Sequence, residues 1–239
     1  MEAGHAAAER QRLPLNRERV LRAAVALADE RGLEALTMRT LGQELGVEAM
    51  SLYNHVKNKD DLLDGVIEVV ATELLEAVQQ VPPPPTPADW KQAMRRRILA
   101  ARDVLLRHRW APEVLESRTN PPPSVMEHYD ALLGLMLGAG FSMDLAHHAM
   151  HALGSRALGF SQELFVSSDD EVPPEMATLM MQQMAMRYPN LGRLVQAVFH
   201  DTGSVLGSGC DDQFEFEFAL DLLLDGLDRM RETHWSLSH

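Results

Sequence analysis

The stretch at residues 36–64, LTMRTLGQELGVEAMSLYNHVKNKDDLLD, decides the fold of this chain. Thr37 is a favourable N-cap residue and predicts the start of a helix over 37–45. Gly46 ends that helix, because glycine readily adopts the left-handed conformation of a helix C-cap. A second short helix is predicted at 48–55. Two short helices joined by a Gly-Val turn have the proportions of a helix-turn-helix.

The flanking sequence extends this unit in both directions. Apolar residues recur at helical spacing over 16–31 and predict a helix there. Asn58 is a favourable cap for a long connector helix at 60–80, which the proline-rich segment 81–87 ends because proline cannot continue a helix. Within the motif, the small Gly42 is expected to let the two short helices cross closely.

The rest of the chain also has helical patterning, so the predicted fold class is all-α. Periodicity and helix breakers predict further helices at 89–109, 123–138, 142–165, 174–199 and 212–234. The alternating segment FEFEFAL at 214–220 belongs to the last of these, because strong helix formers continue it. The expected organisation is a flexible N-terminal arm at 1–15, a three-helix domain at 16–59 and a larger helical domain at 60–239.

Charge is distributed unevenly along the 239 residues, which carry a net charge of −13. Residues 1–59 contain 9 Lys and Arg against 8 Asp and Glu, whereas residues 60–239 contain 13 against 27. The N-terminal part is therefore free to approach a polyanion although the whole chain is acidic.

The composition excludes several classes of protein. Hydrophobic residues make up 46% of the chain and charged residues 24%, which is ordinary for a folded globular protein and unlike a disordered one. A single cysteine, Cys210, excludes an intramolecular disulfide and a thiolate metal cluster. We find no signal peptide and no apolar stretch of membrane-spanning length, so we expect no membrane partner and a cytoplasmic location.

The exposed face of the second short helix has an unusual composition for a solvated surface. It is expected to present small, hydrogen-bonding and aromatic groups rather than Lys and Glu: Ala49, Met50, Ser51, Tyr53, Asn54 and His55. Such groups suit a recognition helix in the major groove of DNA, where they meet base edges, phosphates and thymine methyl groups. This face indicates a DNA-binding domain.

The same segment resembles the DNA-binding signature of the tetracycline-repressor (TetR) family. The resemblance covers residues 16–70 closely, and it is carried by Thr37, Gly46-Val47, Leu52-Tyr53-Asn54-His55 and Lys57-Asn58-Lys59. It implies that Thr37, Tyr53 and Lys59 contact phosphates and that His55 touches the DNA backbone. It further implies that Arg39 reads guanine, and that operator choice is set by Ala49, Met50, Ser51 and Asn54.

The larger domain, which is similar to that of the tetracycline-repressor branch, is implied to dimerise and to bind a small-molecule effector. We therefore expect a homodimeric repressor on a palindromic operator, because two recognition helices must reach successive major grooves. Residues 90–239 hold 11 of the 14 methionines, which either line an adaptable cavity or fill the core. Candidate effector contacts are Arg97, Arg118, His147, Met150 and His151.

Three alternatives remain open from the sequence. Leu75 and Leu115 occupy the positions that correspond to the magnesium-chelate histidines of the tetracycline repressors, so recognition of tetracycline itself is not expected.

A transcriptional activator and a regulator without an effector share the same signature. A helical metal-binding protein or enzyme using His147, His148 and His151 is a different class, but no catalytic glutamate, nucleophile elbow or phosphate loop accompanies them. We expect no enzyme activity, no metal and no cofactor.

Overall fold

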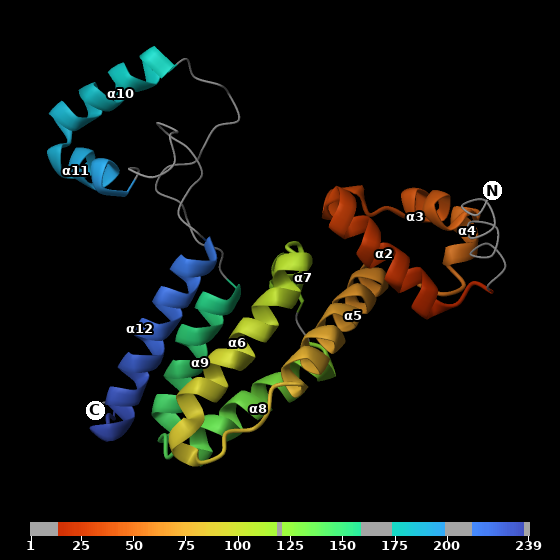
Figure 1. Cartoon of the computed structure of the whole chain (residues 1–239). Coiled ribbons are helices and arrows are strands. Elements are labelled where there is room, and N and C mark those ends of the chain that lie inside the picture. The colour runs from red at the N-terminus through yellow and green to blue at the C-terminus, as the bar shows by residue number, and fades with distance from the viewer. Residues whose placement is uncertain (1–13, 119–120, 159–173, 199–211, 237–239) are drawn as a thin grey trace, which may run out of the picture. The chain divides into compact units, whose positions relative to one another are not determined.

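The computed structural model describes residues 14–118, 121–158, 174–198 and 212–236. These residues form helices joined by turns and contain no strand, which confirms the all-α prediction (Figure 1). The chain divides into two compact units. One holds the described residues up to Leu158 and from Leu223 onward, and the other holds those from 174 to Leu222.

The first described helix, α2 (Arg17–Arg31), has a side-chain cap at its start. The Asn16 side-chain oxygen accepts a hydrogen bond from the Arg19 backbone N–H at 2.8 Å, which satisfies one of the free donors at the helix start. A short 3₁₀ turn, η1 (Leu33–Ala35), follows α2. The prediction of a helix over 16–31 is therefore confirmed.

The two short helices are α3 (Met38–Leu45) and α4 (Ala49–Leu52). Thr37 caps α3 in a reciprocal capping box with Thr40, and Gly46 ends it in the left-handed conformation at φ 68°. At Gly42, a Cβ atom would lie 2.9 Å from the Val47 backbone oxygen. The predicted close crossing of the two helices is thus confirmed, and only glycine allows it.

Helix α4 is shorter than the predicted helix over 48–55. Beyond Leu52, the backbone N–H groups of Tyr53, Asn54 and His55 donate to carbonyls three residues back, at 3.3, 3.4 and 2.8 Å. Such bonds form a tighter turn than the α-helix. The prediction was too long because the chain turns here toward the next helix, whose cap is Asn58.

The body of the first unit is built around α5 (Lys59–Gln79), which packs against α2, α6 (Trp90–Arg107), α7 (Ala111–Glu116) and α8 (Pro123–Gly138). Helix α9 (Met143–Leu158) packs on α6 and α8, and η2 (Pro87–Asp89) precedes α6. In the last part of α12 (Asp212–Glu232), Asp228 accepts a hydrogen bond from the Trp90 indole at 3.0 Å. The connector predicted at 60–80 is confirmed as a helix.

One buried apolar cluster crosses the boundary predicted at residue 59. It joins Val20 and Leu27 of α2 to Leu62 and Val66 of α5, and it continues to Trp110 beyond α6. The helix-turn-helix segment therefore shares its core with the body. The domain limits 1–15, 16–59 and 60–239 stay a prediction, and most of the expected arm lies outside the described residues.

Several predicted helices differ from the observed ones. The helix predicted at 174–199 is two helices, α10 (Pro174–Arg187) and α11 (Pro189–Val198), because Pro189 lacks the N–H that a continuous helix needs. Helix α7 was not predicted, although a proline near its start is typical of a helix N-terminus. The helix predicted at 142–165 agrees with α9, and its last part lies outside the described residues.

Candidate DNA-binding surface and ligand cavity

The residues predicted to bind DNA lie on α3 and its N-cap, on α4 and the turn that follows, and at the first residue of α5. Met50 is 75% exposed and Tyr53 is 45% exposed. Thr37, Arg39, Asn54 and Lys59 are also exposed, whereas Ala49, Ser51 and His55 are half-buried. Leu52, between them, is fully buried in the small core and holds α4 in place. The contacts of these residues with DNA stay a prediction.

Two cations on this surface have no ion-pair partner in the described part of the chain. Arg39 and Lys59 make no ion pair there, whereas Arg22 pairs with Glu18 at 2.7 Å and Arg31 pairs with Glu30 at 3.2 Å. An exposed cation without an ion-pair partner remains available to an external anion.

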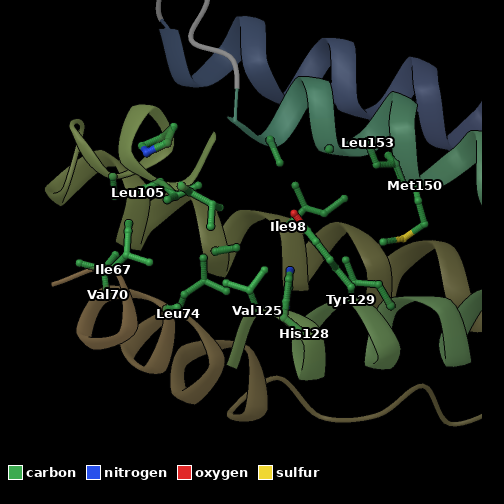
Figure 2. A pocket seen from close by; sticks show the side chains of 18 residues that line it. Ile67, Val70, Leu74, Ile98, Leu105, Val125, His128, Tyr129, Met150 and Leu153 are labelled. Carbon is green, nitrogen blue, oxygen red and sulfur yellow. The ribbon is translucent and has the colours of Figure 1, made fainter. Parts of the chain in front are cut away.

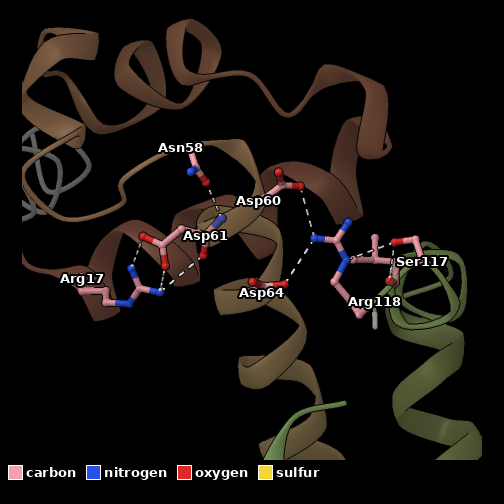
Figure 3. Close-up of polar contacts among 8 residues, drawn as sticks. Arg17, Asn58, Asp60, Asp61, Asp64, Ser117 and Arg118 are labelled. Atoms are coloured by element: carbon pink, nitrogen blue, oxygen red, sulfur yellow. Dashed lines mark hydrogen bonds and ion pairs between the residues drawn. The ribbon is translucent and has the colours of Figure 1, made fainter. Parts of the chain in front are cut away.

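Arg17 and Asp61 attach this surface to the start of α5 (Figure 3). The Arg17 guanidinium donates to both carboxylate oxygens of Asp61, at 2.7 and 3.1 Å, and to the His55 carbonyl at 2.8 Å. Asp61 also accepts from the Lys57 backbone N–H at 2.7 Å. The hydrogen bonds from Arg17 and then Lys57 lower the pKa of Asp61 below its ordinary value. These contacts fix the turn after α4.

A second polar junction joins α2 to the corner between α6 and α7. Asp29 of α2 accepts from the Trp110 indole N–H at 2.7 Å and lies 2.8 Å from Nδ1 of the buried His108. The other ring nitrogen of His108 lies 3.1 Å from Glu73 of α5, which also pairs with Arg107. Burial opposes ionisation of Glu73, but the hydrogen bonds from His108 and Arg107 outweigh it and lower its pKa.

Arg118 forms a third junction and does not line the cavity described below. Its guanidinium lies 3.4 Å from Asp60 and 3.2 Å from Asp64, and its Nε donates to Ser117 at 3.2 Å (Figure 3). The Arg118 side chain is 16% exposed, whereas its partners Asp60 and Asp64 are 79% and 63% exposed, so only the arginine is shielded from solvent. Arg118 therefore holds the end of α7 to the start of α5.

An apolar cavity lies between α5, α6, α7, α8 and α9 (Figure 2). Its volume is about 90 Å³, and most of its walls are aliphatic. The lining residues are Ile67, Val70, Ala71, Leu74, Ile98, Ala101, Leu105, Ala111, Pro112, Leu115, Val125, His128, Tyr129, Leu132, Met150, Leu153, Gly154 and Ala157. A concave, mostly apolar space with a few polar groups is the usual form of a small-molecule site.

Of the residues predicted to contact an effector, some lie at this cavity and others do not. Met150 lines the cavity, and Arg97 lies on α6 one residue before the lining Ile98. His147 and His151 are exposed on α9, where their rings stack edge to face at 4.7 Å, and neither lines the cavity. Within the described residues, no group of three His, Cys, Asp or Glu side chains is placed to hold a metal ion.

The polar residues of the cavity, His128 and Tyr129, were not predicted. Burial and then the charge of Arg97 lower the pKa of His128 to about 4, so its ring is neutral near pH 7. Tyr129 is 37% exposed and lies at the rim, and partial burial raises the pKa of its phenol. Their signal was present in the sequence, because Val125, His128 and Leu132 share one helical face at spacings of three and four residues.

Methionines are not the main lining of this cavity. Met150 is the one methionine in its walls, whereas Met94 and Met136 are fully buried core residues. Met176 and Met186 on α10 are exposed. The sequence left open whether the methionines line a cavity or fill the core, and Met94 and Met136 of the first unit fill the core.

Helix α12 carries an apolar stripe on its N-terminal half. Phe214, Phe218 and Leu222 recur at spacings of four and are 63%, 54% and 58% exposed. The two phenylalanine rings stack at 6.4 Å. An exposed apolar stripe of this kind marks an interaction surface.

Comparisons with known proteins agree with these features. Residues 20–66 match the family model described as bacterial regulatory proteins, tetR family, and residues 83–231 match the tetracyclin repressor-like C-terminal domain. The tetracycline repressor protein class C of Escherichia coli is 29% identical, over 92% of this chain and 93% of its own. The HTH-type transcriptional repressor DrrR1 of Streptomyces coeruleorubidus is 31% identical, over 90% of this chain and 77% of its own.

A solved structure is also similar over nearly the whole chain. The TetR family protein ActR of Streptomyces coelicolor, in complex with actinorhodin, superimposes with a TM-score of 0.64 at 27% identity. The match covers 92% of this chain and 99% of that one. In the part of our chain that the structure describes, no helix has the length and apolar character needed to cross a membrane.

Proposed function

The chain belongs to the TetR family of transcriptional regulators, and we propose that it is a homodimeric repressor that a small molecule releases from a palindromic operator. The observation that carries this proposal is the pairing of two features in one chain. One is an exposed helix-turn-helix surface with unpaired cations, and the other is an apolar cavity bounded by α5, α6, α7, α8 and α9. Its relatives are regulators, and we place it in the cytoplasm with its DNA.

The DNA-binding role rests on the chemistry of the surface. Thr37, Tyr53 and Lys59 offer donors to phosphates, and Arg39 offers the planar donor pair that guanine accepts. Met50 offers an apolar contact for a thymine methyl group. The anchor between Arg17 and Asp61 holds this surface in one orientation, which is what a base-reading helix requires.

Release by an effector rests on the position of α7. Ala111, Pro112 and Leu115 of α7 form one wall of the cavity. The residues on either side of α7 are bound to the two helices that flank the DNA surface: Trp110 to Asp29 of α2, and Arg118 to Asp60 and Asp64 of α5. A molecule that displaces α7 would therefore shift α2 and the start of α5, and with them the spacing of two recognition helices.

Dimerisation is assigned to the apolar stripe of α12. One helix-turn-helix makes few contacts, so a stable complex needs two of them about 34–36 Å apart on the operator. Phe214, Phe218 and Leu222 offer an apolar face that a second copy of the chain would cover. Replacing Phe218 by Asp should give a monomer by sedimentation analysis with much weaker operator binding.

The direct test is titration of the protein against DNA from upstream of its own gene, with an unrelated fragment as control, at low and moderate salt. Saturable binding to a palindrome, at one dimer or more per site, is the expected result. Equal and weak binding to both fragments, repeated across a library of random sequences, would contradict the assignment as an operator-specific regulator.

The effector site is tested with a pair of glycine substitutions. Gly154 lines the cavity and Gly134 does not, and a Cβ at either position would meet no other group within 4 Å. Both Gly154→Leu and Gly134→Leu should raise helix stability by up to about 1 kcal/mol. Only Gly154→Leu should fill the cavity and abolish release from the operator by an effector found in a compound screen. Equal release of both variants would place the effector elsewhere.

A further inference from the structure

Two nitrogen atoms near the cavity lack any hydrogen-bond partner. Nε of Arg97 and Nδ1 of His128 are both shielded from solvent and make no hydrogen bond. Buried polar atoms are nearly always paired, so each unpaired one calls for an explanation. His128 lines the cavity, and Figure 2 shows one of its ring nitrogens directed toward the space beside Ile98.

Arg97 brings a positive charge close to His128, although its own side chain is not among the lining residues. It lies on α6 next to the lining Ile98 and one turn before the lining Ala101. Arg97 is close enough to His128 that its charge disfavours protonation of the ring. Among the described residues, no carboxylate pairs with Arg97. The cavity therefore has mostly aliphatic walls, and an uncompensated positive charge lies close to its lining residue His128.

We propose that the effector is an apolar, aromatic molecule bearing a carboxylate, which Arg97 and the neutral ring of His128 bind at this end of the cavity. The proposal deepens the function proposed above and rests on the cavity being the effector site. A carboxylate accepts from a guanidinium and from an imidazole N–H, and it would satisfy both unpaired nitrogens at once. A neutral apolar effector would leave them unpaired.

The small volume of the cavity and the lack of further charges in its walls restrict the rest of the effector molecule. Its volume of about 90 Å³ is smaller than the roughly 150 Å³ cavity that holds a benzene molecule. One aromatic ring therefore enters only if side chains move. Tyr129 at the rim and the flexible Met150 are the residues whose movement would open it. The walls offer no further charged group, so the rest of the molecule should be uncharged.

The test compares benzoate with its neutral isostere benzamide by calorimetric titration of the full chain. We expect the carboxylate to bind at least about tenfold more tightly, because a hydrogen bond to a charged group contributes roughly twice as much as a neutral one. In Arg97→Met, which keeps the apolar stem and removes the charge, the two compounds should bind equally. Equal affinities in the unmodified protein, or binding of neither compound, would overturn the proposal.

Arg118→Met is the matched control, since Arg118 is also a shielded arginine but pairs with Asp60 and Asp64 away from the cavity. It should keep the preference for the carboxylate. Arg97→Gln serves as a second variant if Arg97→Met fails to fold, and loss of the preference there has the same meaning. A preference that persists in either Arg97 variant that folds would contradict the role of Arg97.

Operator binding is measured in parallel, so that the acid-binding site and the effector-responsive repressor can each be contradicted without the other. Preferential binding of the carboxylate without any change in operator affinity supports the acid site and contradicts release by an effector at this cavity. Release of the operator by the acid and the amide at equal concentrations contradicts the acid site and supports the effector-responsive repressor.

Discussion

The DNA-binding surface and the polar end of the cavity both present nitrogen atoms without acidic partners in the described chain, but they differ in their access to water. Arg39 and Lys59 are exposed, so water satisfies them until an anion replaces it. Nε of Arg97 and Nδ1 of His128 are shielded, so water does not reach them. An unpaired nitrogen therefore costs more free energy at the cavity than on the DNA-binding surface.

This difference indicates the kind of partner at each place. Exposed cations attract any polyanion, and the affinity that they provide falls as the salt concentration rises. Sequence specificity must therefore come from base-reading neighbours such as Met50 and Asn54. Shielded nitrogens gain most from a ligand that reaches them with an acceptor and excludes water. The first region suits a long DNA backbone and the second a single small acid.

The largest effect is expected at the DNA surface. Arg39→Met should weaken operator binding by about 2–6 kcal/mol for the two copies in a dimer, since each bidentate contact with guanine contributes about 1–3 kcal/mol. Binding to unrelated DNA should change much less. Measuring both affinities by fluorescence anisotropy checks this, and an equal loss on both kinds of DNA would show that Arg39 contacts only the backbone.

Lys59→Met and Arg31→Met sharpen the same measurement. Lys59→Met should weaken operator and unrelated DNA alike, and it should reduce the slope of log affinity against log salt by about 1 for each phosphate that the lysine no longer neutralises. Arg31 pairs with Glu30 and lies near Glu44, so Arg31→Met should leave both affinities nearly unchanged. A similar weakening for Arg31→Met would mean that net charge alone sets the binding.

An intermediate effect is expected at the junction that joins the two regions. Asp29→Ala leaves the Trp110 indole and the buried His108 without their acceptor and should destabilise the protein by about 1–3 kcal/mol. It should also reduce the effect of the effector on operator affinity. Denaturant unfolding and operator titration with and without effector check the two parts. An Asp29→Ala protein with full effector response would exclude this junction from the coupling.

The smallest effect is the acid dependence of the DNA-side anchor. The folded pKa of Asp61 is below its ordinary value of 3.8, so Asp61 stabilises the fold at pH above that value and ceases to do so as pH falls through the folded pKa. Asp61→Asn should cost about 1 kcal/mol at pH 7, and the difference from the unmodified protein should shrink as pH falls below 3.8 and through the folded pKa. Unfolding curves between pH 7 and 3 check this, and a difference independent of pH would contradict it.

Local signals accounted for most of the DNA-binding part. Capping residues, a positive-φ glycine and helical periodicity act within a few residues, so Thr37, Gly46 and Asn58 were sufficient to place α3 and the start of α5. The small size of Gly42 predicted the close crossing for the same reason. The length of α4 was overestimated, since the tight turn after Leu52 depends on the anchor to α5.

The cavity depended on contacts between distant segments. Of the five candidates, Met150 lines it and Arg97 lies next to it, whereas Arg118, His147 and His151 lie elsewhere. Sequence spacing places a residue on a helix face, but it does not say which helix that face meets. His128 was missed because its significance depends on Arg97, 31 positions earlier on another helix.

The sequence by itself determined the all-α fold, the helix-turn-helix and its exposed chemistry, because these follow from interactions along a few turns of chain. Only the tertiary structure decided where the cavity lies, which polar groups reach it, and that α7 is tied to α2 and α5 through Trp110 and Arg118. These features arise where five helices pack against one another, and a packing arrangement depends on all of its members together.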